Sequence, residues 1–368
     1  MLDKLQLKDR VLPRVRIAAA AAAVLTVAAA SGCSLLHRGE VKAAVIPPVQ
    51  HVAAIQPLDL TKVQPNEAGT IPVIMYHDIK GTKIHGLQYP IAMFKQDLQW
   101  LYDHNYRPIS LTEFVQGKID CPAGKSPVIL TFDDGLKSQF NFTNDGKIDP
   151  DCAVGIMDAF HAAHPDWSTR ATFFVLTDED PTKPPPFYQK AFAQGKLEYL
   201  VKEGYDIGNH TVHHPRMNKL SDDRVLAEIA GGVDGIHKYL PDYDVNTLAL
   251  PYGYFPKNRK LVVQGESGGV KYHNICAMAA AWRPVPSPMD KAFTPYHLER
   301  IQAGVAEHES AWWLNELEKD KSQKFVSDGD PNTYTINAMA SGQLDKSRLQ
   351  SMHFHLRTYN GTQLVASK

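Results

Sequence analysis

Short apolar runs alternate with segments of helical period from residue 71 onward. The runs are almost continuously apolar, which is typical of strands buried on both faces of a parallel sheet. Between them, apolar residues recur every three or four positions; Phe94, Leu98 and Leu101 would share one helical face. The expected strands are 71–77, 127–132, 170–176, 205–210, 245–250 and 274–281, and the expected helices are 93–106, 151–164, 188–204 and 221–240. This alternation predicts an α/β fold, and strands so short and numerous favour a distorted (β/α) barrel.

The first 33 residues have a different pattern. A basic leader is followed by the apolar stretch 17–32, which is about as long as a signal-peptide core and too short for a membrane span. Cys33 then follows small residues, as in a bacterial lipobox, although Ala30 occupies the position where leucine is usual. We therefore expect a signal peptide over 1–33 with a lipid on Cys33; the alternative is a plain secretory signal. Both alternatives predict export.

The rest of the chain divides into three expected parts. Residues 34–69 contain recurrent prolines and no helical or strand period, which predicts a flexible tether. A catalytic domain is expected over 70–306 and a C-terminal extension over 307–368, the latter opening with an amphipathic helix. In an oxidising compartment, Cys121 and Cys152 are the preferred disulfide pair. The formal net charge of −1 gives no indication of nucleic-acid binding.

Polar or turn-forming residues that could take part in binding or catalysis follow four of the expected strands. They are Tyr76 and His77, Asp133 and Asp134, His210 to His214, and Pro251 to Gly253. In a parallel barrel, the carboxyl ends of the strands meet at one rim, so these residues are expected to converge. Two adjacent carboxylates repel each other, and the facing histidines suggest that a metal ion neutralises one of them.

The spacing of the histidines fits a metal site. His210 and His214 are four residues apart, so a helical turn starting at His210 would present both imidazoles on one side. Two imidazoles and one carboxylate form a three-ligand divalent site that leaves positions for water and substrate. The alternative is that these histidines are ordinary loop residues. Thr211 is expected to cap the helical turn, and His77 either reaches the rim or is a core histidine.

Four motifs resemble those of one enzyme family. "TFDDG" (131–135) and "HTVHH" (210–214) resemble the first two motifs of the polysaccharide deacetylases, carbohydrate esterase family 4, with their NodB homology domain. "RATFFV" (170–175) resembles the strand between those motifs, and "IPVIMYHDI" (71–79) resembles the opening of a lipoprotein subgroup. The resemblance covers about residues 70 to 302 and implies the distorted (β/α) barrel of that family.

The resemblance also implies roles for individual residues. Asp134, His210 and His214 would bind a divalent metal ion, with Zn²⁺ preferred and Co²⁺, Ni²⁺ or Fe²⁺ able to use the same ligands. Asp133 would be the general base that deprotonates the metal-bound water. The backbone N–H of Tyr252, in the "PYG" turn, would bind the oxyanion.

The sequence departs from the family pattern in two places. The third motif usually reads Arg-x-Pro-Tyr, but Ala249 occupies the arginine position, and Arg300 is a candidate to supply the guanidinium from another strand. An ordinary surface arginine is the alternative. The family's general acid has no clear counterpart: His213 or a water is one solution, and His355, in an expected late strand, is another. An exposed strand face is the favoured interpretation of His355.

Together these observations predict a metal-dependent hydrolase that removes N-acetyl groups from an N-acetylhexosamine-containing polysaccharide. It would act in the bacterial cell envelope, bound to a membrane through Cys33 or otherwise secreted. One rival is an O-acetyl polysaccharide esterase, because esters and amides need the same metal, base and oxyanion site. The other is a catalytically inactive, envelope-tethered carbohydrate-binding protein.

Overall fold

The computed structural model describes residues 58–178, 186–280 and 282–365. The predicted signal peptide, Cys33 and most of the predicted tether lie outside these residues and stay predictions. Within the described part of the chain, no helix is long and apolar enough to cross a membrane.

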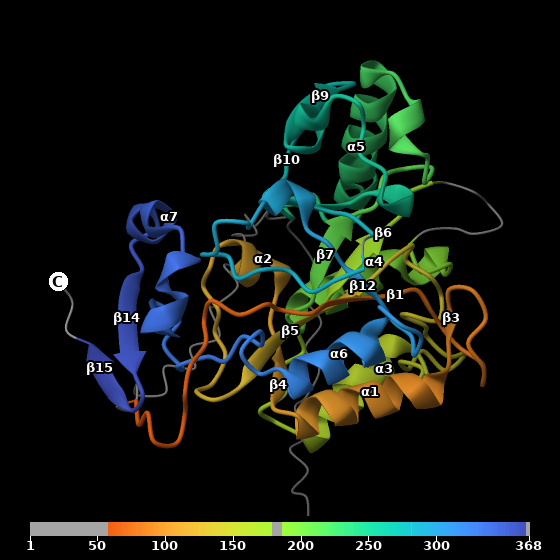
Figure 1. Ribbon diagram of the computed structural model, residues 1–368. Helices are drawn as coiled ribbons and strands as arrows, with labels where there is room; N and C mark the ends of the chain where they lie inside the picture. The colour runs from red at the N-terminus through yellow and green to blue at the C-terminus, as the bar shows by residue number, and fades with distance from the viewer. Residues whose placement is uncertain (1–57, 179–185, 281, 366–368) are drawn as a thin grey trace, which may run out of the picture. The chain divides into compact units, whose positions relative to one another are not determined.

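The core of the fold is a parallel sheet of eight strands (Figure 1). Its strand order is β11-β8-β7-β6-β5-β1-β12, and β4 pairs with the first residues of β5. The sheet is curled into a half-barrel covered by helices, which confirms the predicted distorted (β/α) barrel. Its strands are β1 (Val73–Tyr76), β4 (Tyr106–Pro108), β5 (Ser126–Phe132), β6 (Thr172–Val175), β7 (Asp206–Asn209), β8 (Thr247–Ala249), β11 (Cys276–Met278) and β12 (Ile301–Gln302).

One short segment, residues 298–302, bonds to strands at both edges of the curl. Leu298 donates its backbone N–H to Ala277 at 3.0 Å and accepts from Ala279 at 2.7 Å, which joins it to the end of β11. Ile301 and Gln302 then pair with β1. Arg300 therefore lies on a segment that is fixed on both sides by backbone hydrogen bonds.

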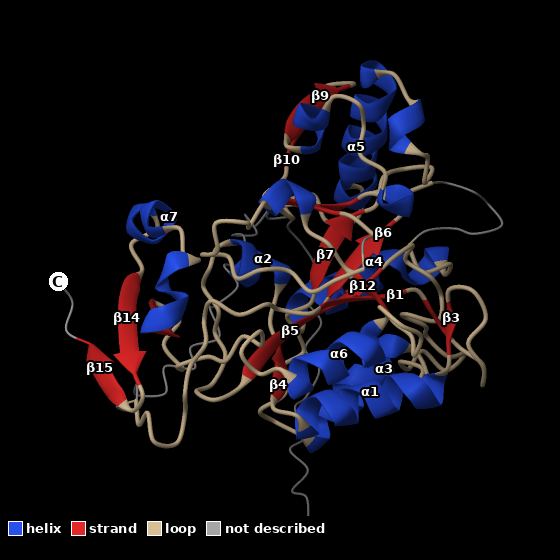
Figure 2. Cartoon of the chain, in the orientation of Figure 1, coloured by secondary structure: helices blue, strands red, loops and turns tan. Residues whose placement is uncertain are grey.

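The helices, drawn in blue in Figure 2, follow the predicted pattern closely. In α1, the buried residues are Phe94, Leu98 and Leu101, the face expected from the sequence. Ser221 is at the N-cap of α5, but its side chain makes no cap hydrogen bond. The α-helices are α1 (Ile91–Asp103), α2 (Leu111–Val115), α3 (Ala153–Ala163), α4 (Ala193–Lys202), α5 (Asp222–His237), α6 (Ser310–Lys319) and α7 (Lys346–Ser351).

Smaller elements complete the described fold. The strand pairs β2 (Asp78–Ile79) with β3 (Gln88–Tyr89), and β9 (Gln264–Ser267) with β10 (Val270–His273), form separate two-stranded sheets. The 3₁₀ turns are η1 (Lys190–Phe192), η2 (Met217–Lys219), η3 (Pro251–Gly253), η4 (Arg259–Val262), η5 (Pro295–His297) and η6 (Ala338–Gly342).

The C-terminal extension has its own sheet but shares a core with the barrel. Strands β13 (Thr333–Asn337), β14 (His355–Asn360) and β15 (Gln363–Val365) form this sheet, and they are drawn in blue in Figure 1. One cluster of buried apolar side chains joins Ile71 and Val73 to Tyr334 and Ile336. The extension therefore buries part of the barrel.

The folded part of the chain begins earlier than the sequence predicted. Leu60 is buried, and Asn66 forms a backbone bridge with Val326. The buried carboxylate of Glu67 accepts the backbone N–H groups of Asp328 at 3.3 Å and Thr335 at 2.5 Å. Residues 58–69 are thus part of the fold and not of a tether that reaches residue 69. The prediction missed this because the contacts are made with residues more than 250 positions away.

The predicted disulfide is absent. Cys121 and Cys152 are both free and buried, and they belong to different apolar clusters. Cys152 is the N-cap of α3, where its Sγ accepts the backbone N–H of Gly155 at 3.4 Å. Each cysteine therefore has a packing role of its own.

Candidate active site

The two adjacent aspartates occupy a strained turn at the end of β5. Asp134 has a φ of 75° and Gly135 a φ of 61°, so two successive residues are left-handed. For a residue other than glycine, this conformation costs about 1–2 kcal/mol. At Gly135, an added Cβ would also lie 3.3 Å from the Val175 side chain, in a backbone conformation that disfavours side chains. The turn lets Asp133 and Asp134 face the same site from neighbouring positions.

Arg300 binds Asp133 with both ends of its guanidinium group. Nη1 donates to Oδ1 at 2.6 Å and Nη2 donates to Oδ2 at 2.7 Å, while Nε donates to the carbonyl of Ala279 at 3.0 Å. Both side chains are buried. The contact proposed to compensate for Ala249 is therefore present, and the alternative of a surface arginine is wrong. Bidentate pairs of this kind fix the carboxylate in orientation as well as in charge.

His210 and His214 are brought together by a loop and not by the helical turn that the sequence predicted. Thr211 and His214 have φ values of 73° and 54°, both left-handed. The side chain of Asn209 accepts the backbone N–H of Thr211 at 2.8 Å, and the Thr211 hydroxyl accepts that of His214 at 3.2 Å. Thr211 thus supports the loop through its side chain, although there is no helix to cap.

Three potential metal ligands converge at the ends of β5 and β7. Single ligand atoms of Asp134, His210 and His214 all lie within 4.8 Å of one another. His210 Nε2 is 3.4 Å from Asp134 Oδ1, and His214 Nε2 is 3.7 Å from the same oxygen. Bonds of 2.0–2.2 Å, which zinc forms with nitrogen and carboxylate ligands, can span these separations.

The hydrogen bonding of His210 supports this assignment. Its Nδ1 lies 2.8 Å from the carbonyl oxygen of Ala249. A carbonyl only accepts, so Nδ1 donates this hydrogen bond and Nε2 is the nitrogen that faces the carboxylates. Burial would lower the pKa of this imidazole, but Asp133 and Asp134 raise it. Nε2 is buried and has no hydrogen-bond partner among the described residues. A buried nitrogen left unpaired and directed at a carboxylate fits a metal ligand with its second nitrogen fixed by a backbone carbonyl.

The charges of the site shift the pKa values of its members. Burial alone would raise the pKa of Asp133, but the Arg300 guanidinium and His210 hold it well below its usual range. Burial would also raise the pKa of Asp134, and its contact with His210 lowers it instead. Burial and the nearby His210 lower the pKa of His214 to about 4, which leaves its imidazole neutral at ordinary pH. Two ionised carboxylates and a neutral His214 are the protonation states that a cation requires.

Tyr252 lies beside this cluster, in the η3 turn that follows β8. Its φ is 55°, and its ring is 4.5 Å from the ring of His214. Gly253 follows with a φ of 70°, and a Cβ there would lie 2.5 Å from the backbone N of Ala280. The turn is therefore held close to β11, with Tyr252 at the edge of the metal ligands. The role of its backbone N–H in binding an oxyanion stays a prediction.

The two candidate general acids lie in different surroundings. His213 Nδ1 is 2.8 Å from Oε1 of the buried Glu228, whose Oε2 accepts the backbone N–H of His213 at 3.0 Å. No contact among the described residues joins His213 to Asp133 or Asp134. His355 is an exposed residue at the start of β14, in the C-terminal sheet. The favoured interpretation of His355 as an exposed strand residue is confirmed.

Two further buried residues, His77 and Gln139, lie next to Asp133. His77 is buried, and its Nε2 lies 3.9 Å from Asp133 Oδ2. Gln139 is fully buried and donates its side-chain amide to the carbonyls of His77, at 2.9 Å, and Asp133, at 2.5 Å. Sequence reasoning left His77 undecided and missed Gln139. A glutamine in a polar loop carries no signal that its amide will join two strand ends.

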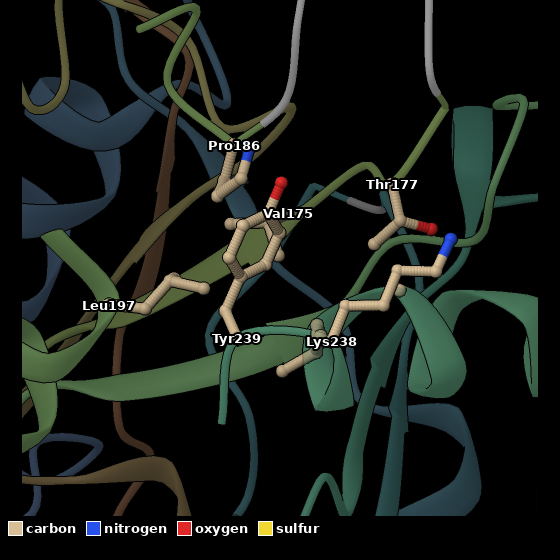
Figure 3. A pocket seen from close by; sticks show the side chains of 8 residues that line it. Val175, Thr177, Pro186, Leu197, Lys238 and Tyr239 are labelled. Carbon is tan, nitrogen blue, oxygen red and sulfur yellow. The ribbon is translucent and has the colours of Figure 1, made fainter. Parts of the chain in front are cut away.

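A small cavity lies elsewhere, between β6, α4 and α5 (Figure 3). It measures about 30 Å³, and Figure 3 shows Val175 and Leu197 near the ring of Tyr239. None of the metal-ligand candidates lines it, and it is too small for a sugar ring. This cavity is therefore not the substrate site.

Comparison with known proteins shows which family this chain is similar to. The family model described as polysaccharide deacetylase matches residues 121–267, which include the Asp133–Asp134 turn and the histidine loop. The peptidoglycan-N-acetylglucosamine deacetylase of Bacillus cereus is 26% identical over 181 residues, 49% of this chain and 56% of that protein. This chain thus spans about half of that relative.

The fold agrees with a solved structure. The Streptococcus pyogenes deacetylase PplD, solved in complex with acetate, has a TM-score of 0.50 and 20% sequence identity, over 67% of this chain and 97% of that one. Over residues 121–267 the chain therefore matches the polysaccharide deacetylase family, and this similarity supports an enzyme of that class.

Proposed function

We propose that this protein removes N-acetyl groups from a polysaccharide that contains N-acetylhexosamine, using a bound divalent cation, with zinc preferred. The observation that carries this proposal is that a candidate cation site and a candidate general base lie side by side at one rim of the sheet. Asp134, His210 and His214 offer three ligand atoms within 4.8 Å of one another, while Asp133, whose Oδ2 is 3.8 Å from His210 Nε2, has both oxygens bound by Arg300. One carboxylate is thus available to a cation and the other to a proton.

The residues of the chain divide the reaction between them. The cation, when bound by Asp134, His210 and His214, supplies Lewis-acid activation of water and of the acetyl carbonyl. Asp133 accepts the proton of the attacking water, and Arg300 keeps its carboxylate ionised and oriented. The backbone N–H of Tyr252 donates to the oxyanion. The proton then passes from Asp133 to the departing amine, directly or through a water.

The rival functions differ in what supports them. An O-acetyl polysaccharide esterase would use the same groups, so product analysis must separate the two. Ala249 and the unassigned general acid favoured an inactive carbohydrate-binding protein; against it, Arg300 gives Asp133 a guanidinium contact despite Ala249. The left-handed conformations of Asp134 and His214 would cost stability in a protein with no use for them.

The test combines metal content with acetate release. In the wild-type protein we expect a bound divalent ion by mass spectrometry and acetate release from N-acetylglucosamine oligomers. Asp133→Asn should keep the metal and lose at least about a hundredfold in turnover, because it removes the base. His210→Ala should lose the metal. Acetate release by metal-free protein, or an active Asp133→Asn variant, would contradict the proposal, and release from acetylated xylan alone would favour the esterase.

We also propose that the protein is held in the bacterial envelope through a lipid on Cys33. The support is the basic leader, the apolar stretch 17–32 and the small residues before Cys33. Cys33→Ala should move the protein from the membrane fraction to the soluble fraction of the producing cells. Mass spectrometry of an unlipidated mature N-terminus in the wild type would overturn this.

A further inference from the structure

Exposed cations gather on two segments that border the candidate active site. The loop after β7 (210–220) and the segment after β8 (250–263) together carry five exposed basic side chains and no aspartate or glutamate. These side chains are Arg216, Lys219, Lys257, Arg259 and Lys260. Because the whole chain has a formal net charge of −1, this excess of positive charge is a local feature.

Neighbouring carboxylates do not neutralise these cations. Within the part of the chain that the structure describes, none of the five forms an ion pair. Arg107, by contrast, binds Asp166 at 2.6 Å. Asp222, on α5, accepts a hydrogen bond from the side chain of Asn258 at 2.8 Å and so adds one negative charge nearby. The two segments together therefore remain positively charged.

Arg216 is held beside the candidate metal ligands. It follows His214 by two positions, and its Cζ lies 5.4 Å from the ring centroids of both Tyr252 and Tyr254. A guanidinium over an aromatic ring is attracted by the electrons of the ring face. The ring of Tyr252 is itself 4.5 Å from the ring of His214. Two ring contacts thus connect the guanidinium of Arg216 to a metal-ligand candidate.

The hydrogen-bond donors of Arg216 remain available. Among the described residues it contacts the two tyrosine rings and forms no hydrogen bond. The five N–H groups of a guanidinium lie in its plane, so contacts with ring faces leave them free. Arg300 instead uses its N–H groups on Asp133 and on the carbonyl of Ala279. Arg216 is therefore the arginine of this region that could bind an anion from outside the protein.

The carboxylates of the candidate active site do not oppose such an anion. Both oxygens of Asp133 are bound by Arg300, and a divalent cation would compensate the charge of Asp134. The loop 141–153, which follows β5, contains three aspartates and one lysine. The loops around the site thus differ in charge, and an acidic ligand would be attracted towards the segments after β7 and β8.

We propose that Arg216 determines specificity for an acidic polymer, with its guanidinium binding a carboxylate of the N-acetylhexosamine polysaccharide. This inference rests on the proposed function, because it specifies the charge of the same substrate. A planar guanidinium pairs with a carboxylate through two parallel hydrogen bonds, which favours a uronate-type residue over a neutral sugar. The other four cations attract the polymer without a specific contact.

The test compares three tetrasaccharides by kcat/KM for acetate release and by affinity in titration calorimetry. The first alternates N-acetylglucosamine with glucuronate, the second is the methyl ester of the first, and the third is the neutral N-acetylglucosamine tetramer. The wild type should prefer the first over the other two by roughly tenfold, because only the first offers a carboxylate. An ionic strength of about 0.5 M should reduce this preference, since exposed charges are screened.

Variants locate the effect in the chain. Arg216→Gln should lower kcat/KM and affinity for the acidic tetrasaccharide roughly tenfold, with little change for its methyl ester. Arg216→Lys should keep part of the preference, because it retains the charge but not the planar fork. Tyr254→Leu, which removes one of the two rings, should lose part of it. The matched control is Arg224→Gln, an exposed arginine on α5 outside both segments, which should keep the full preference.

The two measurements separate the role of Arg216 from the proposed function. If no tetrasaccharide releases acetate, the N-acetyl activity fails, but tighter binding of the acid than of its ester, lost in Arg216→Gln, would still support the role of Arg216. Equal binding and turnover of acid and ester by the wild type would overturn it. An equal loss on both ligands in Arg216→Gln would also overturn it, because the change would then act on the reacting group. A loss in Arg224→Gln as large as in Arg216→Gln would show diffuse attraction and no specific contact.

Discussion

At the scale of single residues, the charge of Asp133 depends on Arg300. In the family pattern an arginine would come from the position of Ala249, at the end of β8, whereas here it comes from the segment after β11. The sequence made Arg300 a candidate but could not show whether its side chain is buried beside Asp133 or exposed at the surface, because that depends on which side of the segment faces the sheet. Its buried contact with Asp133 decides the matter.

Arg300→Met should change both activity and its pH dependence. Without the guanidinium, burial raises the pKa of Asp133, so the acidic limb of the kcat/KM profile should move to higher pH. The removal of one partner of a buried pair also costs about 3–5 kcal/mol of folding free energy. The pH profile of acetate release and a thermal unfolding curve measure the two effects.

Arg300→Lys provides the control for charge without the bidentate geometry. It should keep much of the low pKa of Asp133 but lose turnover, because a lysine cannot hold both carboxylate oxygens. If Arg300→Met left the acidic limb unmoved, the contact would not set the proton affinity of the base.

At the scale of elements, the strands and helices were largely predictable but the connecting turns were not. Continuous apolar runs such as 127–132 and the 3.6-residue period of 93–106 report burial directly, and both elements formed as expected. The left-handed conformations of Asp134, Thr211 and His214 have no such signal, because positive φ is uncommon in residues other than glycine and no residue pattern marks where it occurs. The sequence accordingly predicted a helical turn at residues 210–214, where the structure has a loop; the candidate ligands Asp134, His210 and His214 do lie close together in it.

Lys196, on α4, holds two rim loops through the carbonyls of Phe140 and Phe187, and its titration gives a pH-dependent stability. Burial lowers the pKa of Lys196 from its usual value to about 7. Between pH 7 and 10 the unfolded chain therefore binds more protons at this lysine than the folded chain, so its contribution to stability rises with pH. Lys196→Met should flatten the rise of the unfolding free energy between pH 7 and 9, measured by urea denaturation.

Lys202→Met, at the exposed end of the same helix, is the matched control and should leave the slope unchanged. The same slope in wild type and Lys196→Met would show that Lys196 is not the titrating group. Because Met cannot donate to the carbonyls of Phe140 and Phe187, we also expect a lower stability of Lys196→Met at both pH values.

At the scale of the whole molecule, the N-terminal segment and the C-terminal extension fold together. Glu67 bonds to the backbone of Asp328 and Thr335, and Ala68 and Phe325 belong to one buried cluster. Local sequence patterns carry no information about contacts between residues more than 250 positions apart, which is why residues 58–69 were assigned to the tether. The similarity to polysaccharide deacetylases could be recognised from the sequence because the motifs that carry it are local.

Two truncated chains test this boundary. A chain beginning at residue 58 should keep the melting temperature of the mature protein, whereas one beginning at residue 71 should melt roughly 5–10 °C lower, because it loses Glu67 and exposes the cluster around Phe325. Differential scanning calorimetry on the two chains measures the change. Equal melting temperatures would place the boundary at residue 70, as the sequence analysis had it.

The segment 298–302 has a consequence for how damage to this enzyme would be detected. It pairs with β1 and with the end of β11, and it also carries the counter-charge of Asp133. A substitution that weakens the pairing of 298–302 with β1 or with the end of β11 would separate the Arg300 guanidinium from the Asp133 carboxylate before the sheet unfolds. Early failure of the barrel would therefore be detected as a rise in the proton affinity of its base, and activity at low pH would decline ahead of any loss of secondary structure.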